Sequence, residues 1–258
     1  MVKKKKNNKS RIIPRIILIT AVLLTLAVVM TRLLPIGSKA ISDIDEYGSK
    51  SIAESDPDLI PDYSGEDWIE LNDGLPCFNA WDLSNITGEH YSELDRLGRC
   101  GVAVAMLEDS MRPTDPRGEI GEIRPSGWHQ TKYEGIIDSD PPFLYNRCHL
   151  IAYAMTGQNA NPENLITGTC YMNSTLMLPW EEEVMRYLEA YNGHVLYRVT
   201  PYFKEKELLA RGVEIEAYSV EDGGSGVCFH VFVYNIQPGI ILDYSTGESK
   251  ADTEGGNG

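Results

Sequence analysis

The chain has 258 residues, of which 42% are hydrophobic and 24% are charged, and its formal net charge is −15. This length and apolar content suit one globular domain with tails, and they exclude a chain too polar to form a core. Because an acidic chain repels nucleic acid, the position of its charges matters more than their sum.

The acidic residues are concentrated in two flanking segments. Residues 96–211 contain twelve bases and 15 acids, whereas 41–95 and 212–258 together contain two bases and 23 acids. The flanking acids are typical of a solvated surface that aids solubility. They predict weak, salt-sensitive binding to any nucleic acid.

The first forty residues combine a basic start with an apolar run. Residues 1–40 contain nine Lys and Arg and no acid, and residues 16–30 are uncharged and mostly apolar. This run fits a signal-peptide h-region, whereas residues 16–36 reach the roughly 20 residues that cross a bilayer if Arg32 extends to the interface. We expect residues 1–40 to be a membrane-spanning anchor or a cleaved signal peptide. Either one places the rest outside the cytoplasm, because the positive end stays inside.

Composition then divides the remainder of the chain. Residues 41–65 hold seven acids and one lysine, which predicts an acidic linker. Residues 246–258 are polar and glycine-rich, which predicts a disordered tail. The globular domain is therefore expected over residues 66–245.

Within this domain the apolar spacing predicts mixed secondary structure. Residues 101–107 are expected to form a buried strand, and residues 112–127, with three prolines and three glycines, an irregular loop. Apolar residues at helical spacing predict a helix over 180–191. Three further strands are expected over residues 194–203, 213–220 and 227–236. The predicted class is α+β, an antiparallel sheet flanked by helices.

The five cysteines do not form a recognisable metal motif. They are Cys77, Cys100, Cys148, Cys170 and Cys228. None belongs to a C-x-x-C pair, which argues against a structural zinc site. Their odd number leaves at least one thiol unpaired within the chain, and the sequence leaves the pairing open.

Polar residues suited to phosphodiester hydrolysis are gathered after residue 144. His149 lies two residues after Arg147, and Asn164, Asn173 and Glu181 follow. Hydrolysis needs a base for the water and positive charge for the phosphoryl oxygens, and histidine titrates near neutrality. An amide oxygen such as that of Asn173 binds a hard ion like Mg²⁺ without cancelling its charge, and an arginine fork matches phosphate.

These residues occur within a longer ordered set of motifs. In chain order the motifs are RPSGWHQ (124–130), YNRCHL (145–150), NLITGT (164–169), YMN (171–173), MLPWE (177–181), YRVTP (197–201) and YNIQPG (234–239). This set resembles the DNA/RNA non-specific endonucleases of the ββα-metal superfamily, which include bacterial nucleases of DNA uptake and secreted streptodornases. The resemblance covers roughly residues 66–245. It implies a ββα-metal fold and metal-dependent, sequence-nonspecific cleavage of DNA, with RNA as an open second substrate.

The resemblance also implies a role for each matching position. His149 corresponds to the general base, Asn173 to the ligand of a single Mg²⁺, for which Mn²⁺ can substitute, and Glu181 to the acid that steadies the metal's water shell. Asn164 corresponds to a supporting or substrate-contacting residue, and Arg147 to the arginine beside the base. Arg198 is a further candidate for phosphate contact, since strand alternation turns it away from its apolar neighbours. The expected products carry 5′-phosphate and 3′-hydroxyl ends, and no organic cofactor is expected.

Two positions depart from the family pattern and keep two alternatives open. Asn146 stands where the family has an acid, and Cys148 where it has glycine. Asn146 and the acidic flanks support the alternative of a non-catalytic extracellular module of the same fold that binds nucleic acid or acts as a scaffold. Cys148 beside His149 favours a membrane-anchored cysteine hydrolase, although Cys148 also suits a small buried position.

Overall fold

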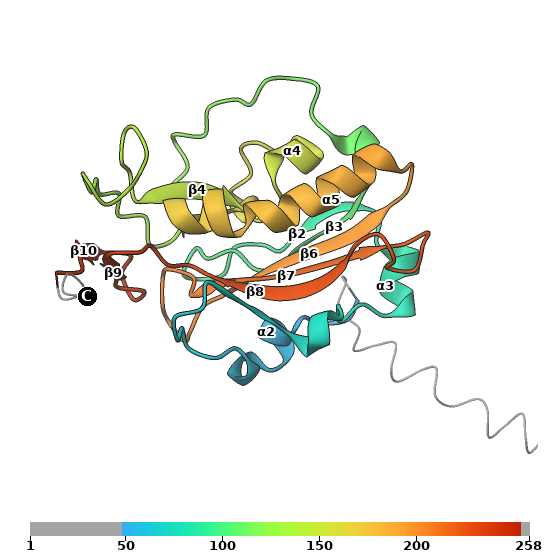
Figure 1. Ribbon diagram of the computed structural model, residues 1–258, viewed down its shortest axis with the longest axis horizontal. Coiled ribbons are helices and arrows are strands. Elements are labelled where there is room, and N and C mark those ends of the chain that lie inside the picture. Colours follow the sequence, from blue (N-terminus) through green and yellow to red (C-terminus); the bar gives the residue numbers. More distant parts are fainter. Residues whose placement is uncertain (1–47, 254–258) are drawn as a thin grey trace, which may run out of the picture. The chain divides into compact units, whose positions relative to one another are not determined.

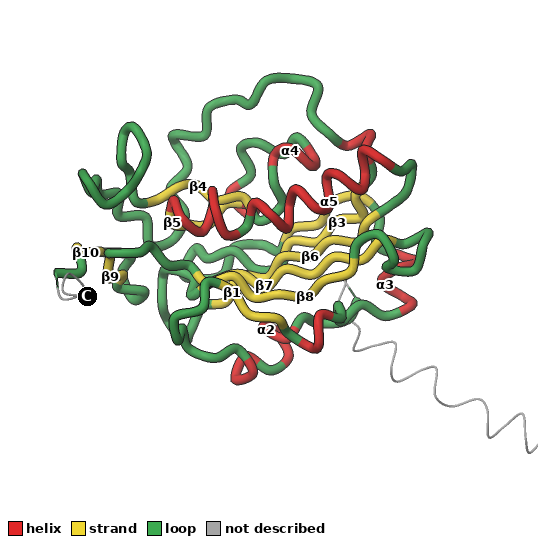
Figure 2. Tube along the Cα trace, viewed as in Figure 1, coloured by secondary structure: helices red, strands yellow, loops and turns green. Residues whose placement is uncertain are grey.

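An antiparallel sheet of six strands forms the centre of the computed structural model, which describes residues 48–253 (Figure 1 and Figure 2). The strand order is β1-β8-β7-β6-β3-β2. The strand bounds are Trp68–Glu70 (β1), Gly88–Tyr91 (β2), Ala103–Leu107 (β3), Val195–Tyr202 (β6), Gly212–Ser219 (β7) and Cys228–Tyr234 (β8). Each neighbouring pair runs antiparallel. The expected α+β class with an antiparallel sheet and helices is confirmed.

Both faces of this sheet are buried. On β7, Val213 and Ile215 belong to the main hydrophobic core, and they alternate with Glu214 and Glu216 on the opposite face. All four side chains are fully buried. Because successive strand residues point to opposite faces, two separate layers must cover the sheet.

A helix and a hairpin cover the first face. The hairpin joins β4 (Tyr145–His149) to β5 (Leu165–Thr169) in antiparallel register, with His149 opposite Leu165. Helix α5 (Leu178–Ala190) follows, and it buries Val184, Tyr187 and Leu188 against the core. Figure 1 shows α5 and β4 together on this side of the sheet. The expected helix over 180–191 is therefore confirmed, with its start two residues earlier.

The second face is covered by the segment that precedes β2. Ile60 and Leu71 pack against Phe232, and Ile86 packs against Val104 and Leu196. Figure 1 places α2 and α3 on this side. The remaining elements are α2 (Ile52–Ser55), η2 (Pro57–Leu59), η3 (Asn72–Gly74), α3 (Ala80–Asn85), η4 (Asp109–Met111), α4 (Tyr153–Thr156), η5 (Pro162–Asn164), η6 (Met172–Leu176), β9 (Ile240–Leu242) and β10 (Ser249–Ala251).

The ordered part extends beyond the expected boundaries of 66–245. In the expected linker, the backbone N–H groups of Ile52 and Ala53 donate to the Glu214 carboxylate at 2.9 and 2.7 Å. In the expected tail, β10 pairs with β9. Composition missed both segments because a few backbone hydrogen bonds and the buried side chains of Ser51 and Ile60 hold otherwise polar stretches on the domain.

The expected anchor or signal peptide at residues 1–40 lies outside the described residues. Within residues 48–253, none of the helices has the length and apolar character needed to span a bilayer.

Candidate active site

His149 lies at the end of β4 and is held through both ring nitrogens. Nε2 is 3.0 Å from the carbonyl oxygen of Asn159, and Nδ1 is 3.1 Å from Nη2 of Arg117. A carbonyl oxygen only accepts hydrogen bonds, so Nε2 carries the proton in this arrangement. Nδ1 is then the nitrogen with a lone pair, which accepts from the Arg117 guanidinium. Nδ1 is therefore the ring nitrogen that could accept a proton.

The surroundings of His149 keep its ring neutral. Its side chain is buried, and burial lowers the pKa from 6.5 to about 4. The positive charge of Arg117 lowers the pKa further, while the hydrogen bond to the Asn159 carbonyl opposes both effects. At neutral pH the imidazole is therefore unprotonated and able to accept a proton.

Asn164 braces the chain that follows His149. Its amide oxygen accepts from the N–H of Ile151 at 2.8 Å, and its amide nitrogen donates to the Ile151 carbonyl at 2.9 Å. The side chain is fully buried. Of the two roles expected for Asn164, the structure supports the bracing role, because both ends of the amide are already used.

Arg147 lies beside His149 with its guanidinium stacked on an aromatic ring. Nε donates to the Ile123 carbonyl at 2.6 Å and Nη2 to the Gly121 carbonyl at 2.7 Å. The guanidinium carbon is 4.2 Å from the centre of the Trp128 ring. These contacts place Arg147 in the wall of a cavity and hold its fork in one orientation.

This cavity, of about 560 Å³, has a strongly basic lining. Its lining residues are Arg117, Ile120, Arg124, Trp128, Gln130, Phe143, Tyr145, Asn146, Arg147 and Asn173, with no carboxylate among them. Burial and the charge of Arg124 lower the pKa of Arg147 while the charge of Glu122 raises it, so Arg124 and Glu122 both lie near the Arg147 guanidinium. In a chain of net charge −15, such a cluster of cations suits an anionic ligand.

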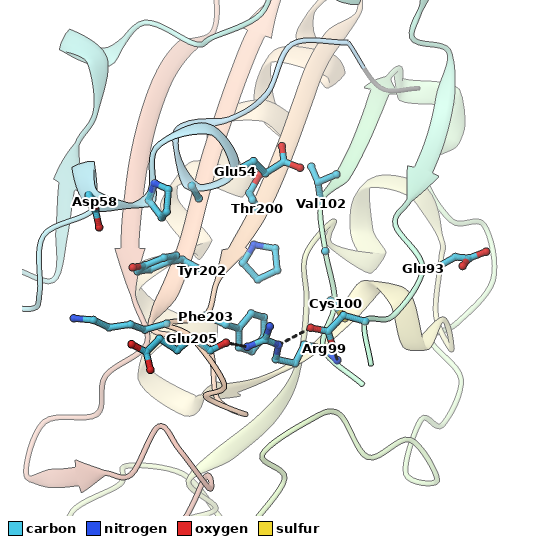
Figure 3. A pocket seen from close by; sticks show the side chains of 16 residues that line it. Glu54, Asp58, Glu93, Arg99, Cys100, Val102, Thr200, Tyr202, Phe203 and Glu205 are labelled. Atoms are coloured by element: carbon cyan, nitrogen blue, oxygen red, sulfur yellow. Dashed lines mark hydrogen bonds and ion pairs between the residues drawn. The ribbon is translucent and has the colours of Figure 1, made fainter. Parts of the chain in front are cut away.

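A second cavity has a predominantly acidic lining. It encloses about 490 Å³ between the segment around α2 and the ends of β3 and β6, and its lining contains five carboxylates and two cations. Figure 3 shows Glu54, Glu93 and Glu205 around it. The side chain of Arg99 is already hydrogen-bonded to neighbouring residues, as the dashed lines mark. A polyanion would be repelled there, so it does not compete as a nucleic-acid site.

Asn173 and Glu181 belong to consecutive helical segments. Asn173 lies in η6, a π-helical turn closed by the bond from the Met177 N–H to the Met172 carbonyl at 2.9 Å. Eight residues of α-helix would leave the two side chains about 80° apart around the axis. A π turn is wider and rotates less per residue, which reduces that offset. The π-helical turn thus brings Asn173 and Glu181 toward the same helix face.

Both side chains have uncommitted oxygen atoms. Within the described residues, no hydrogen bond occupies the side chain of Asn173 or the carboxylate of Glu181. Burial, followed by the charge of Glu182, raises the pKa of Glu181 to about 7. Glu181 is half-buried, and a carboxylate partly removed from water without a donor or cation is costly, so a positive ion beside it would be favourable.

Arg198 does not reach this site, which corrects its expected role in phosphate contact. The side chain is 2% exposed, and Nε donates to Glu216 at 2.6 Å. Its guanidinium lies over Phe78, and another nitrogen donates to the Ser49 carbonyl. Alternation did turn Arg198 away from the apolar core, but that face of β6 is covered by the segment that precedes β2, on the side of the sheet opposite His149.

Cys148 fills a small buried space, which argues against the cysteine hydrolase. Its side chain is 1% exposed, and burial raises the pKa of the thiol well above its usual value. The space exists because residue 168 is glycine: a Cβ at Gly168 would lie 2.7 Å from the Cβ of Cys148. A buried neutral thiol is a poor nucleophile.

Sequence reasoning missed three contributors to the site. Arg117 and Arg124 lie in the loop expected to be irregular, and Asn159 contributes only its backbone carbonyl. Arg124 begins one of the motifs of the resemblance and was available as a signal. Arg117 had no such signal, since its approach to His149 depends on how the loop folds back.

Comparisons with known proteins identify a nuclease family and similar nuclease structures. The family model described as DNA/RNA non-specific endonuclease matches residues 79–221, more than half of the chain. NucA from Streptococcus agalactiae with magnesium ion bound is similar, with TM-score 0.62 and 27% identity, over 71% of this chain and 87% of that one. The Sda1 nuclease with bound zinc ion is similar with TM-score 0.54 and 26% identity, over 65% of this chain and 82% of that one.

Proposed function

The chain belongs to the DNA/RNA non-specific endonuclease family, and we propose that it hydrolyses DNA outside the cytoplasm, with His149 as general base and a single Mg²⁺ held by Asn173. RNA is an open second substrate. Five residues of the proposed machinery follow the resemblance of their motifs, namely Arg147, His149, Asn164, Asn173 and Glu181. The structure adds Arg117 and Arg124 to that set.

One observation carries the proposal. The cavity lined by Arg117, Arg124 and Arg147 also contains Asn173, and the guanidinium of Arg117 contacts Nδ1 of His149. A base, a candidate metal ligand and three cations therefore adjoin one space without a carboxylate in its lining. Phosphodiester hydrolysis needs this combination, because both the substrate and its transition state are anionic.

The base chemistry follows from the hydrogen bonds of His149. With Nε2–H held by the Asn159 carbonyl, Nδ1 takes the proton from the attacking water. Arg117 donates to Nδ1 when no phosphate is present, and a phosphate oxygen is the stronger acceptor for its guanidinium. Substrate binding is thus expected to draw Arg117 from the base and leave Nδ1 free for water.

The residues present fit a hard divalent ion. Asn173 supplies an amide oxygen, and Glu181 supplies a carboxylate whose pKa is raised by burial and by the charge of Glu182, so a nearby cation would stabilise its charged form. Oxygen ligands and retained waters are what Mg²⁺ prefers, with Asn173 as direct ligand and Glu181 as acceptor for its water shell. When bound, the ion supplies positive charge to the phosphoryl and leaving oxygens. The magnesium bound to NucA supports this choice of ion.

The first forty residues bear on where the domain acts in the cell. Their nine bases without an acid, followed by the apolar run, support export of the domain, by a retained membrane anchor or a cleaved signal peptide. The acidic flanks also suit a substrate that is met at high concentration rather than bound tightly.

The test is a plasmid-nicking assay on the purified chain with Mg²⁺. His149→Ala should slow nicking by about 10²- to 10⁴-fold, the usual contribution of a general base, and EDTA should abolish cutting. His129→Ala is the matched control, since His129 is exposed and is not part of the cavity lining. Undiminished nicking by His149→Ala would sink the assignment of the base. Retention of DNA without any nicking by the wild type would favour the non-catalytic binding module.

A further inference from the structure

A second group of potential metal ligands lies on the opposite face of the sheet from His149. Cys77, Glu216 and His230 each offer one ligand atom there, and these atoms all lie within 4.8 Å of one another. They come from three separate segments: the chain after η3, strand β7 and strand β8. Among the residues that the structure describes, this is the one such group of three or more Cys, His, Asp or Glu.

The ring of His230 is oriented as a metal-binding histidine would be. Nδ1 lies 2.9 Å from the Leu75 carbonyl, which only accepts, so Nδ1 carries a proton. Nε2 faces the carboxylates, 2.6 Å from Glu214 and 3.9 Å from Glu216. A histidine ligand characteristically donates its other N–H to a backbone carbonyl, which fixes the ring and its tautomer.

The carboxylate of Glu216 is also held in place. Its Oε2 accepts from Arg198 at 2.6 Å, and its Oε1 accepts from the backbone N–H of Cys77 at 2.7 Å. The second bond places the Cys77 residue itself against the carboxylate. Cys77 is partly exposed, whereas Glu216 and His230 are fully buried, so the Cys77 side is the route by which an ion enters.

Exchange of protons for a divalent ion leaves the charge of this cluster unchanged. Without metal, the charges of Glu214 and Glu216 are balanced by Arg198 and by the ring of His230, whose Nε2 faces both carboxylates. A divalent ion that displaces the Nε2 proton of His230 and the thiol proton of Cys77 adds two positive charges and removes two. A buried group tolerates such an exchange far better than an uncompensated charge.

We propose that Cys77, Glu216 and His230 form a zinc site, independent of the hydrolytic site. Thiolate, imidazole and carboxylate are the ligand types of Zn²⁺, with bonds of about 2.0–2.3 Å. In tetrahedral geometry two ligand atoms of one ion are about 3.3–3.7 Å apart, so the group must contract by up to about 1 Å when the ion binds. The fourth position is left to water on the Cys77 side, with Glu214 as the neighbouring proton acceptor. The ion ties the chain after η3 to β7 and β8, and it stabilises the covering of this face.

Replacement of zinc by cobalt tests the site in the full-length protein. Co²⁺ added to the wild type should produce thiolate-to-cobalt charge-transfer absorption, at one ion per chain, and Zn²⁺ should abolish it. Cys77→Ser should remove the absorption. Cys170→Ser is the matched control, because Cys170 is also partly exposed but lies beside η6, and this variant should keep it. Absence of the band in wild type, or its survival in Cys77→Ser, would overturn the proposal.

A measurement on the wild type covers the case in which Cys77→Ser does not fold. Zn²⁺ should slow alkylation of Cys77 at least tenfold, as mapped by mass spectrometry, while alkylation of Cys170 in the same molecules stays unchanged. Equal rates at Cys77 with and without Zn²⁺ would mean that the cluster is an ion-pair network without a metal, and the zinc site would be rejected.

Discussion

Arg117 donates from Nη2 to Nδ1 of His149 across 3.1 Å, and these two residues are 32 positions apart in the sequence. The loop that carries Arg117 is tied down nearby, since the hydroxyl of Tyr153 donates to the Asp115 carbonyl at 2.7 Å. The guanidinium therefore occupies the position beside Nδ1 from which a water molecule would donate its proton. Arg117 links the proposed base to the basic cavity, and the first prediction concerns it.

Arg117→Gln should impair cleavage and raise the pKa of His149. The variant removes one phosphate contact. The slope of log K for DNA binding against log salt concentration should therefore decrease in magnitude by about one. It also removes a positive charge that lowers the pKa of His149, so that pKa should move up from about 4. The acidic limb of the pH profile of kcat/KM, together with a histidine NMR titration, measures this change.

The control for Arg117 comes from the same loop. Arg112 pairs with Asp109 at the surface and is not part of the cavity lining. Arg112→Gln should leave both the pH profile and the salt slope as they are. An unshifted His149 pKa in Arg117→Gln would contradict the contact inferred here.

Asn173→Ala and Glu181→Gln should each raise the Mg²⁺ concentration that gives half-maximal nicking. Loss of a group beside the metal's water shell typically weakens metal binding about 10- to 100-fold. We expect at least that for Asn173→Ala, which loses a direct ligand. Glu182→Gln changes the exposed neighbour of Glu181 and should have little effect. A Mg²⁺ titration identical in Glu181→Gln and wild type would remove Glu181 from the site.

The stability of the protein should fall as the pH drops from about 6.5 to about 4, in part because of His149. Folding lowers the pKa of this residue, since burial disfavours its charged form. Below pH 6.5 the unfolded state therefore binds a proton that the folded state does not, and unfolding becomes more favourable. The stabilisation is complete above pH 6.5 and is lost by about pH 4, with a difference of about 3 kcal/mol.

Urea unfolding at pH 7 and pH 4.5 measures this linkage. Many carboxylates titrate in the same range, so wild type is compared with His149→Ala, which lacks the titrating ring. The loss of unfolding free energy between the two pH values should be smaller in the variant. Equal losses would show that His149 titrates alike in both states.

Arg198→Met should destabilise the protein without weakening its contact with DNA. Removal of one partner from a buried ion pair leaves the charge of Glu216 uncompensated, which costs about 3–5 kcal/mol. The salt slope of DNA binding should not change, because Arg198 lies on the far side of the sheet. Arg147→Met provides the comparison: it should lose about one unit of salt slope. A reduced slope in folded Arg198→Met would restore its role in phosphate binding.

Strand and helix positions were predictable where apolar spacing was regular. The strands β3, β6, β7 and β8 and the helix α5 overlap the ranges expected for them. The β4–β5 hairpin had no such pattern. Its YNRCH and LITGT strands mix polar and apolar residues on both faces, so neither strand shows the alternation that predicts a half-buried strand. The motif residues were visible in the sequence, but the element that carries them was not.

The sequence by itself determined the class of fold, the family and the residues around His149, because those depend on local spacing and on the order of motifs. It also determined that Arg198 turns away from Tyr197 and Val199, since alternation along a strand is local. Only the tertiary structure decided which segment packs against that face of the strand. The side chain packs under the segment that contains Ser49 and Phe78, far away in the chain, so its charge pairs with Glu216 rather than with a phosphate.

The same reason separates the two candidate ion sites. Asn173 and Glu181 are eight positions apart on two consecutive helical segments, so a motif could reveal them. Cys77, Glu216 and His230 are brought together only when the covering segment closes over β7 and β8. Arg117 likewise reaches His149 only through the fold of its loop. Contacts between distant segments depend on the packing of whole layers, and no spacing along the chain encodes them.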